Sequence, residues 1–465
     1  MDLSSRLRAI VKGGPPKPVR ELTYEPDAGG YEAVMDIARV GAMLGGRPAT
    51  TPFGQCLVID RRYEADRFHG SIRVGACDVE DCSALGVLDP ALGEVAGRRQ
   101  AGHASSRTFA RTVFIDLETT GLSGGAGTVA FLVGCGYFDL GAFQVTQFLL
   151  TSFASERALL AAVASFFEGV DLIVTYNGKT FDVPVMETRW MFHRLQMPLA
   201  EVPHFDMLHP ARRLWRMRTG AGGAIEDSGC RLSTLEHTLF SVTRVGDVDG
   251  FEIPGRFFQF LRSGDPRPLE PVLEHNRLDL VSLAAVMARG VQLAREGHSA
   301  CRDEAEALAL GRIYERAGSD ERLDDRVRAV ERADACYRRA AGSPAPEVRG
   351  EALYRIGLCH RRERRFADAA AIWRSVIELT EPRGVRRQAG LRELRQFAVE
   401  ALAIHHEHRE RDLEGARELA LFALEEANGR RADGMRHRIA RIDRKMSVTK
   451  ARRLAHERDA QLFTS

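Results

Sequence analysis

Residues 113–122, VFIDLETTGL, decide how this chain of 465 residues folds. The β-branched and apolar residues at the start of this stretch predict a strand. Asp116 and Glu118 are two positions apart, so their side chains share one face of it. Two carboxylates on one face repel each other unless a cation lies between them. The alternative is an acidic pair that faces solvent at the end of a strand, which is a common arrangement.

Two further acidic residues lie in similar surroundings, Asp182 at the end of VTYNGKTFD and Asp279 inside LEHNRLDLVSL. A carboxylate beside apolar segments is costly unless it is paired or bound to a cation. Four converging carboxylates would make an oxygen-rich site suited to Mg²⁺ or Mn²⁺. Two such ions roughly 3.5–4 Å apart activate a water and stabilise the leaving oxygen of a phosphodiester. Taken alone, Asp182 also fits an ordinary aspartate at a helix N-terminus.

His275 precedes Asp279 by four positions, so the two residues share one face of a predicted helix. A histidine one turn from a metal-binding aspartate can deprotonate a metal-bound water, because its ordinary pKa is about 6.5. The alternative is a simple His–Asp pair on the surface of a helix. Asn276 and Arg277 are expected to point elsewhere and to serve substrate binding or structure.

The pattern of apolar residues from about 109 to 297 predicts strands and helices in a definite order. Three strand candidates come first, separated by turns that contain glycine. A helix, a buried strand, a second helix and a long final helix follow. This order predicts an α/β ribonuclease-H-like domain, a mixed sheet flanked by helices, within residues 108–297. The expected strands span 112–118, 129–138, 143–150 and 171–177, and the expected helices span 155–169, 183–197 and 268–297.

From about residue 303 the chain reads as wholly helical, and a short pattern recurs in it at intervals of 46 residues. The pattern resembles tetratricopeptide repeats, although their ordinary period is about 34. The resemblance implies an all-α solenoid over residues 303–427, with a surface that could bind a protein partner. The recurring segments are Leu310-Gly311-x-x-Tyr314, Ile356-Gly357-x-x-His360 and Leu402-Ala403-x-x-His406.

The two ends of the chain read differently from its middle. Residues 428–465 hold eleven Lys or Arg against four Asp or Glu, a local charge of +7 in a chain of net charge +2. An apolar stripe from Met435 to Met446 predicts a last helix that caps the solenoid. A basic surface that attracts nucleic-acid phosphates is the alternative. Residues 1–107 read as a loosely packed leader of unknown role with a few strands.

The composition, with 44% hydrophobic and 28% charged residues, is that of a soluble globular protein. No apolar run approaches the roughly 18–20 residues that span a bilayer, and the N-terminus lacks the apolar core of a secretory signal. A cytoplasmic protein is therefore expected, with its eight cysteines reduced. A zinc site formed by Cys77, Cys82, His69 and His103 is the alternative use of two of these thiols.

Taken together, the acidic motifs resemble those of a known family. D-x-E, then N-x-x-x-F-D, then H-N-R-x-D are similar in kind and order to the three exonuclease motifs of the DEDD (DnaQ-like) superfamily. The surrounding sequence resembles the bacterial YprB-like branch, over about residues 109–290 and loosely over the repeats. The resemblance implies that His275 is the general base and that two Mg²⁺ or Mn²⁺ ions are bound by Asp116, Glu118, Asp182 and Asp279.

One departure from the family pattern concerns the base. The branch of the family with a histidine usually places it five positions before the last aspartate, whereas the branch with a tyrosine uses four. This chain combines histidine, at His275, with the four-residue spacing. The family pattern therefore matches this chain fully at the four ligands and only in part at the base.

The resemblance implies a 3′–5′ exonuclease that hydrolyses phosphodiester bonds of DNA or RNA, with single-stranded 3′ ends as expected substrates. Asn177 and Lys179 are expected to contact phosphate or sugar, and Thr119, which lies beside the first motif, is a further candidate for substrate binding. Leu122 matches a position where the family often wedges a side chain against the terminal base, and a turn leucine packed on the core is the alternative. Asp206 is expected to be structural or to support a metal ligand, and not to be a ligand itself. The alternatives are a scaffold that binds nucleic acid without cutting it, and an endonuclease that uses the same site.

Overall fold

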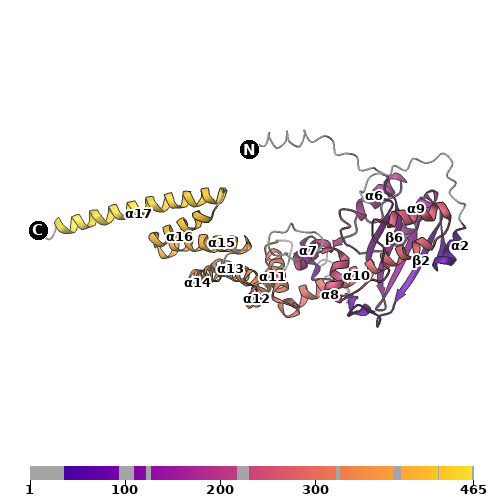
Figure 1. Cartoon of the computed structure of the whole chain (residues 1–465), viewed down its shortest axis with the longest axis horizontal. Coiled ribbons are helices and arrows are strands. Elements are labelled where there is room, and N and C mark those ends of the chain that lie inside the picture. Colours follow the sequence, from indigo (N-terminus) through magenta and orange to yellow (C-terminus); the bar gives the residue numbers. More distant parts are fainter. Residues whose placement is uncertain are drawn as a thin grey trace, which may run out of the picture.

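The computed structural model describes residues 36–93, 109–121, 127–216, 230–320, 325–380, 389–427 and 429–462. Figure 1 shows an α/β part at one end of the long axis and a helical part that extends from it and finishes in α17. An α/β domain followed by an all-α region is therefore confirmed. No helix among the described residues is long and apolar enough to cross a membrane.

A mixed sheet of seven strands forms the centre of the α/β part, in the order β1-β2-β7-β6-β5-β8-β9. The strand β5 carries Asp116 and Glu118 between an antiparallel neighbour, β6, and a parallel neighbour, β8. The three predicted antiparallel strands and the predicted parallel strand are thus confirmed. The strands are β1 (Arg47–Thr51), β2 (Gly54–Tyr63), β5 (Thr112–Thr119), β6 (Ala130–Asp139), β7 (Ala142–Leu149), β8 (Leu172–Thr175) and β9 (His204–Asp206), with a separate hairpin of β3 (Phe68–His69) and β4 (Ile72–Arg73).

Helices cover both faces of this sheet, because the side chains of β5 alternate between two apolar cores. Odd-numbered residues from Val113 to Leu117 pack with α5, α6 and α9, whereas Phe114 packs on the other face with α3, α7, α8 and α10. Asp116 and Glu118 share the face of Phe114 and so lie toward α10. The bounds are α3 (Leu85–Leu88), α5 (Glu156–Phe166), α6 (Asp182–Phe192), α7 (Leu208–Trp215), α8 (Leu232–Phe240), α9 (Ile253–Ser263) and α10 (Glu270–Glu296).

The sheet extends further toward the N-terminus than its sequence pattern indicates. β2 pairs with the outer edge of β7, and β1 pairs with β2. The helix α2 (Ile37–Leu44) packs in the same core as the odd-numbered residues of β5. Residues 47–63 are therefore not a loosely packed leader, because their backbone groups complete the sheet and residues Cys56–Ile59 are buried. The boundary expected at residue 107 falls between two parts of one sheet.

The helical part is built from helices that pack pairwise along the chain, and α17 packs on α16. The glycines of the recurring pattern make room for aromatic rings of the next helix. A Cβ on Gly311 would lie 2.6 Å from the ring of Tyr337, and a Cβ on Gly357 would lie 2.2 Å from the indole nitrogen of Trp373. The helices are α11 (Glu304–Gly318), α12 (Arg326–Ala340), α13 (Pro346–Arg362), α14 (Phe366–Leu379), α15 (Ala389–His405), α16 (Leu413–Glu426) and α17 (Arg430–Leu462).

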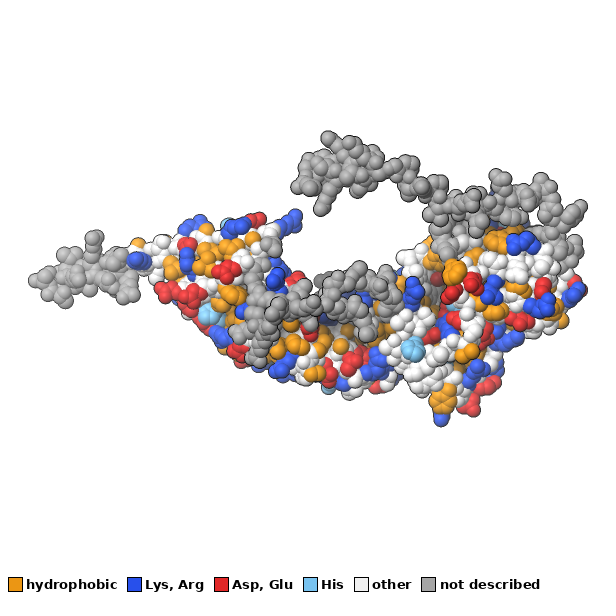
Figure 2. Space-filling model, in the orientation of Figure 1, with side chains coloured by type: hydrophobic (Ala, Val, Ile, Leu, Met, Phe, Trp, Pro, Cys, Tyr) orange, Lys and Arg blue, Asp and Glu red, His pale blue; other side chains and the backbone are white. Residues whose placement is uncertain are grey.

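The basic last helix is held by its own charges as well as by its apolar stripe. Met435 and Ile442 are buried, as expected for a helix that caps the solenoid. The buried carboxylate of Glu407 receives three basic side chains of α17. On the face shown in Figure 2, acidic and basic side chains are interspersed over the helical part, so this face does not favour the alternative of a continuous basic surface. The three basic side chains are Arg438, Arg441 and Lys445.

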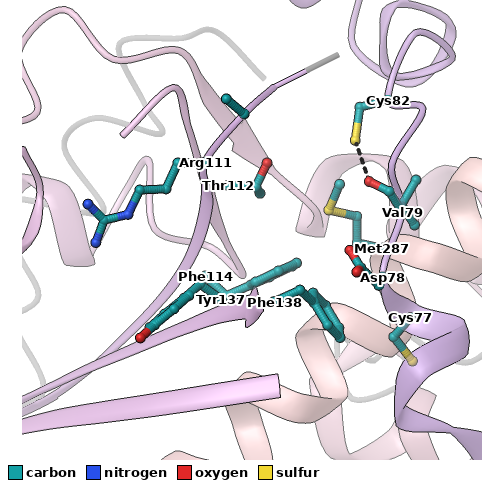
Figure 3. Close-up of a pocket in the computed structure, with 11 residues that line it drawn as sticks. Cys77, Asp78, Val79, Cys82, Arg111, Thr112, Phe114, Tyr137, Phe138 and Met287 are labelled. Atoms are coloured by element: carbon teal, nitrogen blue, oxygen red, sulfur yellow. Dashed lines mark hydrogen bonds between the residues drawn. The ribbon is translucent and has the colours of Figure 1, made fainter. Parts of the chain in front are cut away.

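All eight cysteines are buried, and none forms a disulfide. Cys77 and Cys82 line a cavity of about 50 Å³, drawn in Figure 3, and their thiols donate to backbone carbonyls. Burial raises the pKa of the Cys77 thiol to about 12. The imidazole of His69 lies 2.8 Å from the hydroxyl of Ser282. These groups therefore form no zinc site with one another, and His103 lies outside the described residues.

Candidate active site

One row of residues across the sheet forms the floor of the site. The strand register places Asp116 on β5 opposite Gly134 on β6, and Gly134 opposite Gln147 on β7. Asn276 of α10 fills the space above Gly134, where a Cβ would lie 2.1 Å from the Asn276 amide oxygen. Its amide donates to the Asp116 carboxylate at 2.7 Å and accepts from Gln147 at 2.8 Å. The expectation that Asn276 points elsewhere was wrong, because a glycine on the neighbouring strand lets it reach the sheet.

The four acidic residues singled out in the sequence come together above the C-terminal end of β5. Burial raises the pKa of Asp116 well above its usual range, and the charges of Asp279, Glu118 and Asp182 raise it further. Burial also raises the pKa of Glu118, together with the charges of Asp279 and Asp182. Asp182 is the first residue of α6, and burial, with Asp206 nearby, raises its pKa to about 7.

A cation that the motifs did not reveal lies beside these carboxylates. Arg244 donates to Asp279 at 2.5 Å, to Asp247 at 3.2 Å and to both carboxylate oxygens of Glu236, at 2.6 and 2.8 Å. Glu236 of α8 is buried, and an unpaired carboxylate there would be costly. No motif in the sequence marks Glu236, so its need for a nearby cation is visible only in the structure. Arg244 itself lies between α8 and α9, in a segment without periodicity or motif.

His275 is oriented by a second residue that the motifs did not reveal. Its Nδ1 lies 2.7 Å from a carboxylate oxygen of Asp247, and its Nε2 lies 3.6 Å from a carboxylate oxygen of Asp279. A carboxylate that accepts from Nδ1–H leaves Nε2 as the nitrogen that can accept a proton. The predicted pairing of His275 with Asp279 on one face of α10 is confirmed. The imidazole also has a partner from outside that helix.

The turn between β8 and α6 is organised by Asp206 at the end of β9. Its carboxylate accepts from the backbone N–H groups of Asn177 at 2.8 Å and Lys179 at 3.0 Å, which agrees with the structural role expected of it. Asn177 adopts a left-handed backbone with φ of 71°. The Lys179 ammonium lies 3.2 Å from the carboxylate of Asp89. Both candidate substrate residues therefore sit on a fixed turn directly before Asp182.

The other two candidate substrate residues lie at the end of β5 and in the turn after it. Thr119 is buried, and its hydroxyl donates to the backbone carbonyl of Gly121 at 2.7 Å, so it shapes the turn that leaves the strand. Leu122 lies outside the described residues. Its predicted contact with a terminal base therefore stays a prediction.

The donor set fits divalent cations that prefer oxygen ligands. Four carboxylates lie near one another, and burial disfavours the charged forms of Asp116, Glu118 and Asp182, so a cation among them would relieve both effects. The four carboxylates lie farther apart than the ligands of a closed metal site. Among the described residues, three candidate ligands approach within 4.8 Å of one another only at His406, Glu410 and Asp412. The pairing of Arg244 with Asp279 would have to yield before Asp279 joined the other three at a shared ion.

We expect the stability of the metal-free protein to fall as pH rises through the pKa of Asp182. That pKa is about 7 in the folded chain, against 3.8 for the ordinary group, so the folded state binds this proton more tightly than the unfolded state. The proton on Asp182 contributes its full stabilisation below about pH 4. As pH rises to 7 this contribution is lost, which lowers the free energy of unfolding by up to about 4 kcal/mol. Urea unfolding with a chelator at several pH values measures this loss.

The matched control is the isosteric Asp182→Asn, which keeps the shape and removes the titration. Its free energy of unfolding is expected to fall less between pH 4 and pH 7.5 than that of the wild type. Parallel pH profiles for the two proteins would contradict the assignment of a raised pKa to Asp182.

Comparison with known proteins defines the class that this fold and this acidic site belong to. Residues 113–290, from β5 into α10, match the RNase_H superfamily. Membership of this superfamily supports nuclease activity on a nucleic-acid substrate, and the superfamily generally uses divalent metal ions.

A relative extends the match beyond that domain. The chain is 30% identical over 342 residues to the Bacillus subtilis (strain 168) protein YprB, whose description is an uncharacterized protein. The match covers 72% of this chain and 75% of YprB. The chain belongs to the YprB family.

Proposed function

We propose that the protein is a DEDD-type exonuclease that removes nucleotides from 3′ ends of DNA or RNA. The observation that carries the proposal is the convergence of Asp116, Glu118, Asp182 and Asp279 at the end of β5. These carboxylates come from a strand, the first residue of a helix and a late helix. Membership of the RNase_H superfamily supports the same reaction class.

Each polar group of the site has a role in this proposal. The four carboxylates would hold two Mg²⁺ or Mn²⁺ ions, which activate the attacking water and stabilise the leaving oxygen when bound. His275 would take the proton of that water at Nε2, and Asp247 would hold its ring in the required tautomer. Asn276 would hold the Asp116 carboxylate in one rotamer.

The second part of the proposal concerns a protein partner of the helical part. The glycine-to-aromatic packing of Gly311 on Tyr337 and of Gly357 on Trp373 supports tetratricopeptide-like repeats with a long interval. Such repeats present extended surfaces to protein partners. We therefore propose that α11–α16 bind a protein that brings the nuclease domain to its substrate.

A second candidate function rests on Arg244. A guanidinium 2.5 Å from Asp279 neutralises that carboxylate without any metal ion. A chain in which this pair persists would bind nucleic acid as a scaffold and cut it weakly or not at all. Calorimetric titration with Mn²⁺ separates the two candidates, because the scaffold should show no binding that depends on Asp116.

The test of the proposed reaction uses the ends of the substrate. Single strands of DNA and RNA carrying a 5′ label are incubated with the full chain and Mg²⁺ or Mn²⁺. We expect a ladder of products, each shortened by one nucleotide from the 3′ end, and no product when a chelator is present. The same strands with blocked 3′ ends, and circular strands, should remain intact.

The circular strand also provides the contradicting outcome. Cleavage of the circular strand at a rate similar to that of the open strand would show that the protein is an endonuclease that uses the same site, and not an exonuclease. Stable single strands under every metal and end condition, with Mn²⁺ binding absent, would leave the scaffold as the function.

A further inference from the structure

The junction between α15 and α16 gathers several side chains that the nuclease site does not use. The α-helix ends at His405, and residues His406–Glu410 continue it as one turn of π-helix. Arg411 then reverses the chain with φ of 59°, and Asp412 caps the N-terminus of α16. π-helical turns are rare and frequently occur at functional sites. This one places two histidines and two carboxylates on one side of the junction.

The ligand atoms at this junction lie close together. Nδ1 of His406 is 2.9 Å from Oδ2 of Asp412 and 3.1 Å from Oε2 of Glu410. The other carboxylate oxygen of Glu410 is 3.1 Å from Nε2 of His405. His406, Glu410 and Asp412 form the one group of three candidate ligands within 4.8 Å among the described residues. All three are at least partly open to solvent, so an ion could enter.

Hydrogen bonds alone do not account for this arrangement of side chains. A neutral imidazole carries one N–H, yet the Nδ1 of His406 faces oxygens of two carboxylates that repel each other. Arg374 of α14, 3.3 Å from Glu410, offsets part of this charge from one side. The remaining explanations are a protonated His406 between two carboxylates or a cation that takes one bond from each residue.

The donor set selects the kind of cation. Mg²⁺ and Ca²⁺ take oxygen ligands, whereas imidazole nitrogen together with carboxylate oxygen suits Zn²⁺. Zinc bonds of about 2.0–2.2 Å in a tetrahedron place the ligand atoms roughly 3.3–3.6 Å apart, so the oxygens now 3.1 and 2.9 Å from Nδ1 of His406 would move outward by a few tenths of an ångström or more to take an ion. His405 stands next to this group as a further nitrogen donor.

We propose that the α15–α16 junction, residues 405–412, binds one Zn²⁺ ion through His406, Glu410 and Asp412. The ion ties the end of one helix to the start of the next. Its effect extends to the last helix, because Glu407 in the same π-helical turn receives the basic side chains of α17. Zinc therefore stabilises the end of the helical part, independently of the acidic residues near β5.

The test is a calorimetric titration of the full chain with Zn²⁺ at pH 7, followed by thermal unfolding with and without the ion. Two variants remove one ligand each. His406→Gln removes the ring nitrogen. Asp412→Asn keeps the cap of α16, since an asparagine oxygen can still accept from the backbone N–H of Gly415. For each variant we expect affinity for the junction ion to fall at least tenfold and the thermal shift caused by zinc to disappear.

Two controls locate the bound ion. His408→Gln removes a histidine of the same turn that lies outside the group of three, and it should bind zinc as the wild type does. Repeating each titration in the Asp116→Asn background removes a candidate ligand near β5, so zinc bound there is counted separately. Absence of zinc binding by the wild type, or equal affinity in the wild type, His406→Gln and Asp412→Asn, would overturn the proposal and leave a protonated His406 as the explanation.

Discussion

Asp116→Asn is expected to reduce the metal-dependent degradation of nucleic acid by about 1,000-fold or more. The change keeps the shape of the side chain and an oxygen that can accept the hydrogen bond from Asn276. It removes the negative charge that the proposed ions require. The measurement is the initial rate of release of nucleotides from a labelled single strand in Mg²⁺ or Mn²⁺.

The same substitution separates lost chemistry from lost folding. Asp116 is buried and repelled by Asp279, Glu118 and Asp182, so removing its charge should raise the stability of the metal-free protein. Asp139→Asn, at an exposed position where β6 ends, is the matched control and should keep full activity. A fully active Asp116→Asn protein would contradict the proposed site.

Gly134→Ala has the second large expected effect, although Gly134 carries no side chain. The added Cβ would lie 2.1 Å from the amide oxygen of Asn276 and 2.7 Å from its amide nitrogen. Displacing this buried amide leaves Asp116 and Gln147 without a shared partner. We expect a loss of roughly 2–5 kcal/mol in the free energy of unfolding, measured with urea. We also expect the metal-dependent degradation of nucleic acid to fall, because Asp116 loses the amide that holds it.

A second substitution tests whether the space above Gly134 is the cause. In the background of Asn276→Ala the added methyl group has room, so Gly134→Ala should cost less there than in the wild type. Gly255→Ala in α9 is the control, since nothing lies within 4 Å of its added Cβ. Equal losses for Gly134→Ala in both backgrounds would show that the methyl group and Asn276 do not compete for one space.

The order of elements and the four acidic positions could be predicted because each depends on local sequence. β5, β6 and β7 are dense in β-branched and aromatic residues, and α10 has a long uninterrupted helical pattern. Asp116, Glu118, Asp182 and Asp279 stand at element ends or on one helix face, where the fold brings them together. The roles given to these residues stay predictions.

Contacts between distant segments could not be predicted. Arg244 and Asp247 belong to a loop without periodicity, and the residues that they contact on α10 are more than 25 positions away. Asn276 reaches the sheet only because of the register that sets Gly134 opposite Asp116. The segments that form β1 and β2 are flanked by turn residues, and nothing in their local sequence identifies β7 as the strand with which β2 pairs.

The pairing of β2 with β7 determines where the nuclease unit can be separated from the rest of the chain. A fragment that began at residue 108 would retain every proposed metal ligand, yet it would leave the outer edge of β7 without its partner. Open edges of apolar strands pair readily with other chains, so such a fragment would tend to associate with itself. A fragment that keeps this sheet whole therefore has to include α2, β1 and β2, a segment that contributes none of the proposed metal ligands.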